Sequence, residues 1–224
     1  MALVLLAAYG VSAAQAANVE ELVNHARNTV QNFTGDPQMD WFHDHVRDAK
    51  GVLIIPRLLK GGFIFGGSGG SGVLLARDPQ NGAWSYPAFY TIGSFTVGPQ
   101  IGGEAAEIVL LIMTQQGIDS MLATSAKLGA DVDVAAGPVG VGTKAATADV
   151  IAFSRAKGLF AGASVEGAIV AARDGWNEEF YKQSVRPIEI LREHRVTNPQ
   201  ADALREELAK VSGSVPTGPA PGRY

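Results

Sequence analysis

Short apolar runs separated by glycine clusters dominate the first half of the chain and predict a β-sheet. Residues 50–77, KGVLIIPRLLKGGFIFGGSGGSGVLLAR, place glycines between β-branched and aromatic runs, which is typical of buried strands joined by tight turns. Residues 84–114 are again apolar with glycine interruptions, and residues 104–113 are continuous enough for another buried strand. Alternation at residues 131–134 predicts a further strand, and residues 160–172 supply the last ones.

Helical spacing of apolar residues occurs on both sides of this region. Residues 18–32 predict an amphipathic helix that docks on the sheet. Near the other end, Asn177 begins a helical region that breaks at Pro187. Another helical piece runs to His194, and a final helix runs from Asn198 or Pro199 to about Val211. Pro199 suits the first position of that helix, because its fixed φ and missing N–H cost nothing there.

Composition agrees with one domain that has many turns. The chain has 224 residues, of which 46% are apolar, 18% are charged and 27 are glycine. Because glycines at bends permit sharp curvature, we predict an α+β fold. Its expected form is a glycine-rich, strongly bent antiparallel or barrel-like β-sheet, with N-terminal and C-terminal helices packed on it.

The two ends of the chain differ from the rest. Residues 1–16 are apolar and finish in Ala14-Gln15-Ala16, the small-x-small form of a signal peptide, although a basic start is missing and a buried helix is the alternative. Residues 212–224 are rich in Gly, Pro and Ser and predict a flexible tail. We therefore expect a signal peptide over residues 1–16, one domain over residues 18–211, and then the tail.

An internal similarity links two parts of the sheet region. The sequences AKG at residues 49–51 and GVLLAR at residues 72–77 are echoed by AKG at residues 156–158 and GAIVAAR at residues 167–173. Either the sheet has two duplicated halves, or strands rich in Gly, Ala and Val resemble each other by chance.

Charge and cysteine content narrow the function classes. The net charge is −4, yet residues 50–77 contain Lys50, Arg57, Lys60 and Arg77 and no acid, so this segment offers a local cationic surface to an anionic partner. Cysteine is absent, which excludes disulfides, thiolate metal sites and cysteine nucleophiles. Nothing in the sequence points to nucleic acid.

Several catalytic signatures occur in an unsuitable context. Residues 67–72 fit a dinucleotide-binding G-x-G-x-x-G, and Ser68 fits the G-x-S-x-G of a hydrolase, but apolar strand residues follow where both motifs need a helix. Residues 137–144 resemble a phosphate loop with its last two residues exchanged. His43 and His45 are two apart, so they do not share a helix face and make a weak metal site. We expect no catalysis, metal or cofactor.

The ordered glycine motifs resemble those of the SYLF family, also called Ysc84-type or DUF500, in an exported bacterial form. The resemblance spans residues 18–211 and rests on AKGVLIIPRLLKGGFIFGGSGGSGVLLAR, WSYPAFYTIGSFTVGPQIGGEAAEIVLLI, GPVGVG and GLFAGASVEG. It implies a lipid-binding domain, with phosphoinositide recognition in eukaryotic members and general phospholipid binding in exported bacterial ones. Some eukaryotic relatives bind actin through a lysine-rich segment, but here Arg27 is the one strong base between residues 18 and 34, so we expect no actin binding.

The sequence thus predicts a non-enzymatic peripheral protein that recognises anionic phospholipid headgroups. The expected lipid-binding residues are Lys50, Arg57, Lys60 and Lys157. The alternatives are a scaffold that contacts another protein of the cell envelope and, less favoured, a serine hydrolase that uses Ser68. The expected location is periplasmic or secreted, with peripheral contact to a membrane.

Overall fold

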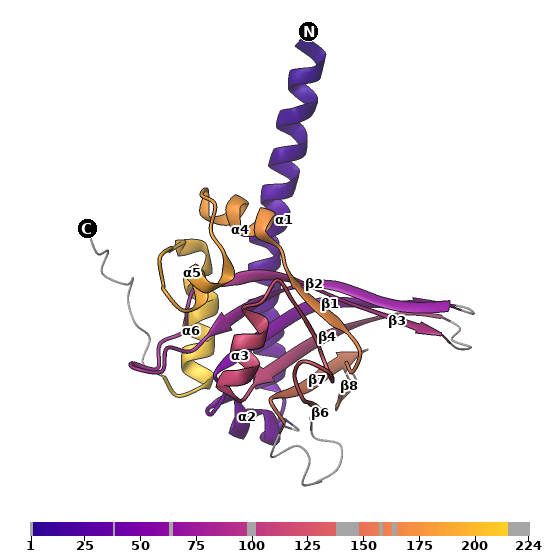
Figure 1. The fold of residues 1–224 in the computed structure, drawn as a ribbon, viewed down its shortest axis with the longest axis vertical. Coiled ribbons are helices and arrows are strands. Elements are labelled where there is room, and N and C mark those ends of the chain that lie inside the picture. Colours follow the sequence, from indigo (N-terminus) through magenta and orange to yellow (C-terminus); the bar gives the residue numbers. More distant parts are fainter. Residues whose placement is uncertain are drawn as a thin grey trace.

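The computed structural model of the protein describes residues 2–37, 39–62, 65–97, 102–137, 148–156, 159–162 and 165–214. Within these residues, helices lie at both ends of the chain and one large sheet lies between them (Figure 1). The helices are α1 (Ala2–Gly35), α2 (Asp40–Val46), α3 (Gln115–Met121), α4 (Asp174–Tyr181), α5 (Pro187–Leu191), the 3-10 turn η1 (Pro199–Ala201) and α6 (Asp202–Val211). The strands are β1 (Gly51–Gly62), β2 (Phe65–Ala76), β3 (Ala88–Val97), β4 (Gly102–Ile112), β5 (Ser125–Lys127), β6 (Val134–Ala136), β7 (Val150–Ala156), β8 (Leu159–Gly162) and β9 (Ile169–Ala172).

The strands form one sheet in the order β5-β9-β3-β2-β1-β4-β7-β6, with β8 paired to β7. Long antiparallel ladders join β3, β2, β1 and β4 in its centre. Only β6 departs from this pattern among the described strands, because it pairs with β7 in parallel. The order has two ends, so the sheet that the described residues form is curled but not closed (Figure 1).

The predicted α+β class with a strongly bent sheet and terminal helices is therefore confirmed, with a correction to strand direction. The sheet is mixed and not purely antiparallel. The apparent duplication is not a structural repeat either. Strands β1 and β2 are neighbours, whereas their counterparts β8 and β9 are not: β8 pairs with β7, and β9 pairs with β3 and β5 on the other side of the β1–β2 pair.

Register assigns side chains to two faces of the sheet. One face, here called the α1 face, carries Arg57, Leu59, Phe89 and Glu107. Helices α1 and α4 pack on it, since Thr29 of α1 donates to Glu107 at 2.9 Å and further contacts join α4 to β3. The other face, here called the α3 face, carries Leu58 and Tyr90, and the Tyr90 hydroxyl donates to the Met121 carbonyl at 2.7 Å.

The core occupies both faces. On the α3 face, one row across six strands is buried throughout apart from its glycine; it comprises Ala106, Leu58, Gly70, Ile92, Val170 and Ala126. On the α1 face, α1 contributes a stripe at helical spacing, comprising Val19, Val23, Ala26, Val30 and Phe33. The ring of Phe89 meets Phe180 of α4 edge-on at 5.1 Å between centroids. Both faces of the central strands are thus packed, which is why their sequences are continuously apolar.

The helix ends follow local sequence rules. Helix α1 is longer than the predicted 18–32, since it runs from Ala2 to Gly35. As predicted, the helical region breaks before Pro187 and a second helical piece follows it: α4 ends at Tyr181, Pro187 begins α5, and Pro199 begins η1. Asn198 caps that turn by accepting from the Gln200 N–H at 3.1 Å. Among the described helices, none is long and apolar enough to cross a membrane.

Candidate functional site

The predicted lipid-binding residues do not form one cluster. Lys50 immediately precedes β1 and Lys60 lies ten residues later, near the opposite end of the strand, about 33 Å away at the usual rise per residue. Arg57 lies closer to Lys60, and all three side chains are exposed. Lys157 lies outside the described residues. The structure thus brings Arg57 and Lys60 into one segment and separates Lys50 from them.

A β-bulge around Pro56 exposes that segment. The pairing of β1 with β2 shifts between Ile54 and Arg57, and its pairing with β4 shifts between Ile55 and Leu58. Proline has no N–H to donate to a ladder, so it is tolerated at such a bulge. Beyond the bulge, Leu58 is buried at 2%, whereas Leu59 is 50% exposed. An exposed leucine therefore lies between two exposed bases.

The β1–β4 region of the α1 face holds a cavity of about 430 Å³ beside Arg57. Helix α1 contributes His25, Asn28 and Thr29 to its lining, and the sheet contributes Pro56, Arg57, Ala105, Ala106, Glu107 and Arg155. The carboxylate of Glu107 accepts from Thr29 and Asn32, both at 2.9 Å, and from Arg155 at 2.8 Å. Glu107 thereby joins α1 to β4 and β7. The Arg57 guanidinium has no hydrogen bond or ion pair among the described contacts, so its charge is available to a ligand.

Lys50 faces a different cavity, of about 570 Å³, between the start of β1 and the segment after α5. Arg192 and His194 also line it, but each is paired with an acid: Arg192 binds Asp119, and His194 lies 3.6 Å from Asp78. Burial lowers the pKa of His194 below its ordinary value, although the nearby Asp78 carboxylate opposes that shift. This cavity is nearly balanced in charge, which makes it a weaker anion site than the Arg57 segment.

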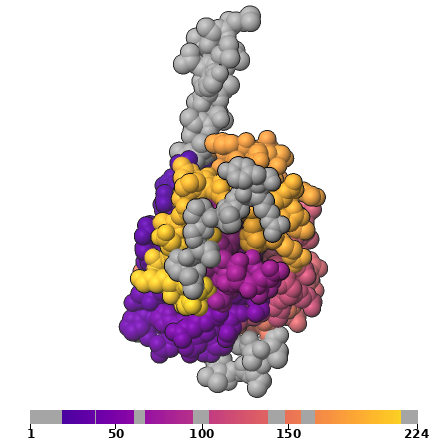
Figure 2. Space-filling model, turned by 90° about the vertical axis from the view of Figure 1, so that its left-hand side faces the viewer, coloured from indigo at the N-terminus to yellow at the C-terminus, as the bar shows by residue number. Residues whose placement is uncertain are grey.

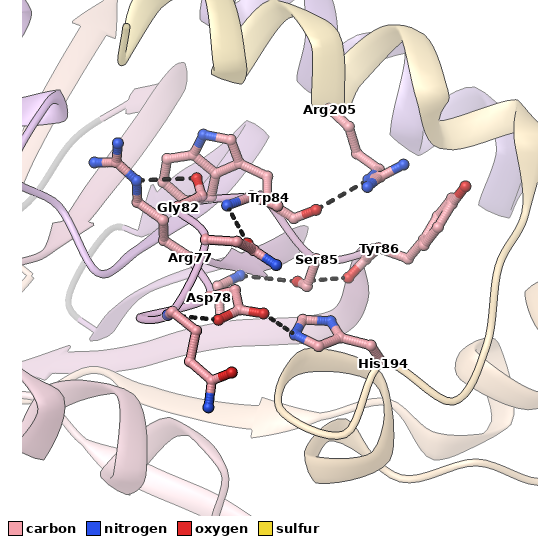
Figure 3. Close-up of polar contacts among 12 residues, drawn as sticks. Arg77, Asp78, Gly82, Trp84, Ser85, Tyr86, His194 and Arg205 are labelled. Carbon is pink, nitrogen blue, oxygen red and sulfur yellow. Dashed lines mark hydrogen bonds and ion pairs between the residues drawn. The ribbon is translucent and has the colours of Figure 1, made fainter. Parts of the chain in front are cut away.

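Arg77, the fourth base of the sequence segment, holds a loop and is not free for a ligand. Its guanidinium donates to the carbonyls of Arg47 and Gly82 and to the Ser214 hydroxyl. Figure 3 shows the Arg77 guanidinium beside the Gly82 carbonyl and near the Trp84 ring. The role of Arg77 in the described structure is therefore to fix the β2–β3 loop.

That loop, residues 77–87, is also tied to α6. Arg205 donates to the Trp84 carbonyl at 3.0 Å, and its guanidinium lies over the Tyr86 ring at 4.1 Å (Figure 3). The Tyr86 hydroxyl donates to Asp202 at 2.8 Å, and burial together with this bond raises the pKa of Tyr86 to about 12. In the space-filling view, the loop lies between α6 and the indigo surface of the N-terminal part of the chain (Figure 2). These contacts hold the loop against α6, and the sequence analysis did not predict them.

The catalytic signatures lie where their chemistry is not supported. Residues 67–72 lie wholly inside β2, so no helix N-terminus follows for a pyrophosphate. The Ser68 hydroxyl bonds to the Ser94 hydroxyl at 2.7 Å on the neighbouring strand, and no strand-to-helix elbow presents it. Of the loop at 137–144, residues 138–144 lie outside the described residues.

The paired histidines lie on the short helix α2. His43 Nε2 lies 3.0 Å from the Thr34 carbonyl, and His45 stacks on Trp41 with 3.5 Å between ring centroids. Within the described residues, no three His, Cys, Asp or Glu side chains are placed to hold a metal ion. Both rings have local partners that account for their presence.

Comparison with known proteins identifies the family. Residues 93–211 match the family model Ysc84, described as "Las17-binding protein actin regulator". The chain is 37% identical over 169 residues to LAS seventeen-binding protein 3 of Saccharomyces cerevisiae. This aligned region covers 72% of the chain and 36% of the relative. It is 32% identical over 169 residues to human SH3 domain-containing YSC84-like protein 1, and this aligned region covers 73% of the chain and 49% of the relative.

The chain therefore spans between about a third and a half of these relatives. A third one, Protein YSC84 of Saccharomyces cerevisiae, is 35% identical over 167 residues, which cover 71% of the chain and 35% of the relative. No solved structure has significant similarity to the chain.

The comparisons correct one expectation. Actin-related binding was set aside because residues 18–34 contain a single strong base, but the family description names Las17 binding and actin regulation. The lysine-poor helix is thus no reason to exclude partners of this kind. The same description names protein binding and no reaction, which agrees with the unsupported catalytic motifs. From its sequence motifs, its curled sheet and the match over residues 93–211, the chain belongs to the Ysc84, or SYLF, family.

Proposed function

We propose that the protein binds anionic phospholipid surfaces peripherally through Arg57, Leu59 and Lys60, here called the β1 surface segment. The observation that carries this proposal is the half-exposed Leu59 between two exposed bases. The hairpin ends of β1 to β3 extend past the helices in Figure 1, so a headgroup layer can reach both faces of this strand. Apolar insertion beside cationic contacts is the usual arrangement of a peripheral lipid-binding surface.

The energies of these contacts are small one by one. Each base near an anionic surface contributes about 1 kcal/mol, and burying the exposed half of a leucine contributes about 1 kcal/mol more. The segment would then supply about 3 kcal/mol, which is weak for a soluble protein and strongly dependent on salt.

Sedimentation with vesicles tests the proposal. We expect binding to phosphatidylglycerol, cardiolipin and phosphoinositide vesicles, little binding to phosphatidylcholine, and loss of binding as salt rises. R57E/K60E should abolish the binding, while K50E/K210E, which makes the same charge change at two exposed lysines outside the segment, should reduce it only slightly. Equal losses in the two variants would show that net charge and not the β1 surface segment governs binding. Unchanged binding of R57E/K60E would refute the site.

We also propose that residues 1–16 are removed on export and that the mature protein is periplasmic or secreted. The buried stripe of α1 from Val19 to Phe33 lies after Ala16, so cleavage there would keep that stripe. Mass spectrometry of the N-terminus of the protein purified from its native host is the test: a start at Ala17 supports export, and an intact start contradicts it.

A protein partner of the actin-regulatory kind is the second candidate. The family description favours it directly, because it names Las17 binding and actin regulation. Sedimentation with purified actin filaments, with and without anionic vesicles, separates the two candidates. Filament binding that survives R57E/K60E would place the protein-binding surface elsewhere than the β1 surface segment. No filament binding at about 100-fold the protein concentration used for vesicles would argue against direct actin contact.

A further inference from the structure

Two exposed apolar side chains face each other across the α1 face of the sheet. Leu59 and Ile169, at 50% and 51% exposure, are the large hydrophobic residues left exposed among those whose side chains are described. Register places them in one transverse row: Leu59 pairs with Gly69, Gly69 with Gly93, and Gly93 with Ile169. Three strand spacings of about 4.8 Å separate them, so the two walls stand about 14 Å apart.

The floor between these walls is backbone with small side chains. Gly69 and Gly93 form it in the row of Leu59, and Ser71 and Thr91 form it in the next row on the same face. We call the space bounded by Leu59 and Ile169 and floored by these four residues the glycine trough. A trough of this form lets another chain approach the sheet backbone closely.

The fold itself does not require glycine at the centre of the trough. On the α3 face, a Cβ on Gly70 would lie 2.6 Å from the Arg57 carbonyl oxygen, and one on Gly72 would lie 2.3 Å from that of Ile54, so the bulge demands both glycines. On the α1 face, a Cβ on Gly69 would meet nothing closer than 4.0 Å, and one on Gly93 nothing closer than 3.6 Å. Neither has a positive φ. Because glycine weakens a strand interior, these two positions point to something outside the fold.

Positive charge borders one end of the trough. Arg57 flanks Ser71 in the next row, and its charge has no described partner. Arg173 donates to the Thr91 hydroxyl at 3.3 Å and stacks on Trp176 at 4.0 Å. The Glu107 carboxylate, which lies on the same face, is already bound by Arg155. An occupant should therefore be apolar along its length and acidic where it meets these arginines.

We propose that the glycine trough docks an acidic amphipathic α-helix from a protein partner. The Cα atoms of an α-helix lie on a cylinder of radius about 2.3 Å, so its backbone fits between Leu59 and Ile169, with its side chains packed against the walls and the floor. Its apolar stripe would contact the two walls and approach Gly69 and Gly93, and its carboxylates would pair with Arg57 and Arg173. A flat bilayer would touch the walls without entering the floor, so filling the floor distinguishes the two occupants. The proposal shares Leu59 and Arg57 with the lipid surface but stands without it.

The probe is a fluorescein-labelled, end-capped peptide of about 18 residues, or five helical turns. It carries leucines at helical spacing on one face and glutamates on both flanks, and a control peptide carries lysines in place of the glutamates. Fluorescence anisotropy should give saturable binding of the acidic peptide below about 1 mM and much weaker binding of the control. Absence of saturable binding, or equal binding of both peptides, would overturn the proposal.

Filling the trough is the decisive variant. G69V/G93V should weaken peptide binding at least tenfold, equivalent to about 1.4 kcal/mol, while the melting temperature stays equal or rises. S125V adds the same kind of apolar group to an exposed site of this face beyond Ile169 and should leave the affinity unchanged. Vesicle binding of G69V/G93V should also be unchanged. If the valines leave the peptide affinity intact, or if peptide and vesicle binding fall together, the trough does not select a helix and the proposal fails.

Discussion

Glu107→Ala should destabilise the protein more than any other single change to a partly exposed carboxylate of the sheet, because Glu107 is the point at which α1 is bonded to β4 and β7. The carboxylate is 19% exposed and is surrounded by donors from three elements. Thr29 and Asn32 approach it at 2.9 Å from α1, and Arg155 approaches at 2.8 Å from β7. The alanine variant removes the acceptor and leaves these donors partly buried.

The magnitude can be worked from these contacts. Each of the two α1 hydrogen bonds to a charged, part-buried acceptor contributes about 1 kcal/mol, and the pair with Arg155, whose side chain is 32% exposed, contributes about 1 kcal/mol more after screening. The expected loss in free energy of unfolding is about 3 kcal/mol. For a chain of this size that corresponds to a fall in melting temperature of about 6–12 °C.

Urea unfolding followed by circular dichroism measures the change. Glu104→Ala is the matched control, since Glu104 lies on the same strand but is exposed, and its cross-strand neighbour is the exposed Lys60. We expect less than about 0.5 kcal/mol from that control. A loss below about 1 kcal/mol for Glu107→Ala, or equal losses in the two variants, would refute the idea that this carboxylate holds α1 on the sheet.

Three further results are expected. Thr114→Ala should cost about 1 kcal/mol in urea unfolding, because the Thr114 hydroxyl caps α3 by accepting from the Gly117 N–H at 3.0 Å; a loss near zero would contradict the cap. Because the folded pKa of His194 is lowered, the unfolded chain binds its proton first, so stability should fall as pH drops below about 6.5 and level off once pH is below the folded pKa. Asparagine tolerates the left-handed backbone of His194, so His194→Asn should keep the fold and reduce the change of melting temperature with pH between pH 5 and 7. An unchanged pH dependence would mean that other groups cause it. Gly137→Ala should be strongly destabilising by thermal melting, since its Cβ would lie 2.4 Å from the Phe153 ring, whereas a tolerated alanine would mean that the ring can move.

Sequence patterns predicted the strands well where burial on both faces made them continuously apolar. Residues 50–77 gave the hairpin of β1 and β2 because glycine clusters mark its turn and its bulge. The parallel pairing of β6 with β7 could not be predicted, since three residues such as Val134–Ala136 carry no signal of direction. Helices α2 and α3 were missed for a similar reason: seven residues are too short for helical periodicity to stand out.

The candidate site was only partly predictable. Lys50, Arg57 and Lys60 look equivalent in the sequence, but a strand places residues ten apart at distant points. The exposure of Leu59 depends on the bulge at Pro56, and a proline inside an apolar run was the available signal. The sequence could not show that Leu59 and Ile169 lie in one transverse row on the same face of the sheet, because that requires the register across β2, β3 and β9.

The bulge at Pro56 divides β1 into two parts that can change independently. Before it, Val52 to Ile55 are buried and packed against the rest of the sheet, so substitutions there affect folding. After it, the side chains of Arg57, Leu59 and Lys60 are exposed to solvent, so substitutions there affect the binding of a ligand or partner and not folding. The exposed part of this strand can therefore change its binding preference during evolution without a loss of protein stability. Loss of the single inserted residue would remove that freedom, because it would turn Arg57 and Leu59 toward the interior and Leu58 outward.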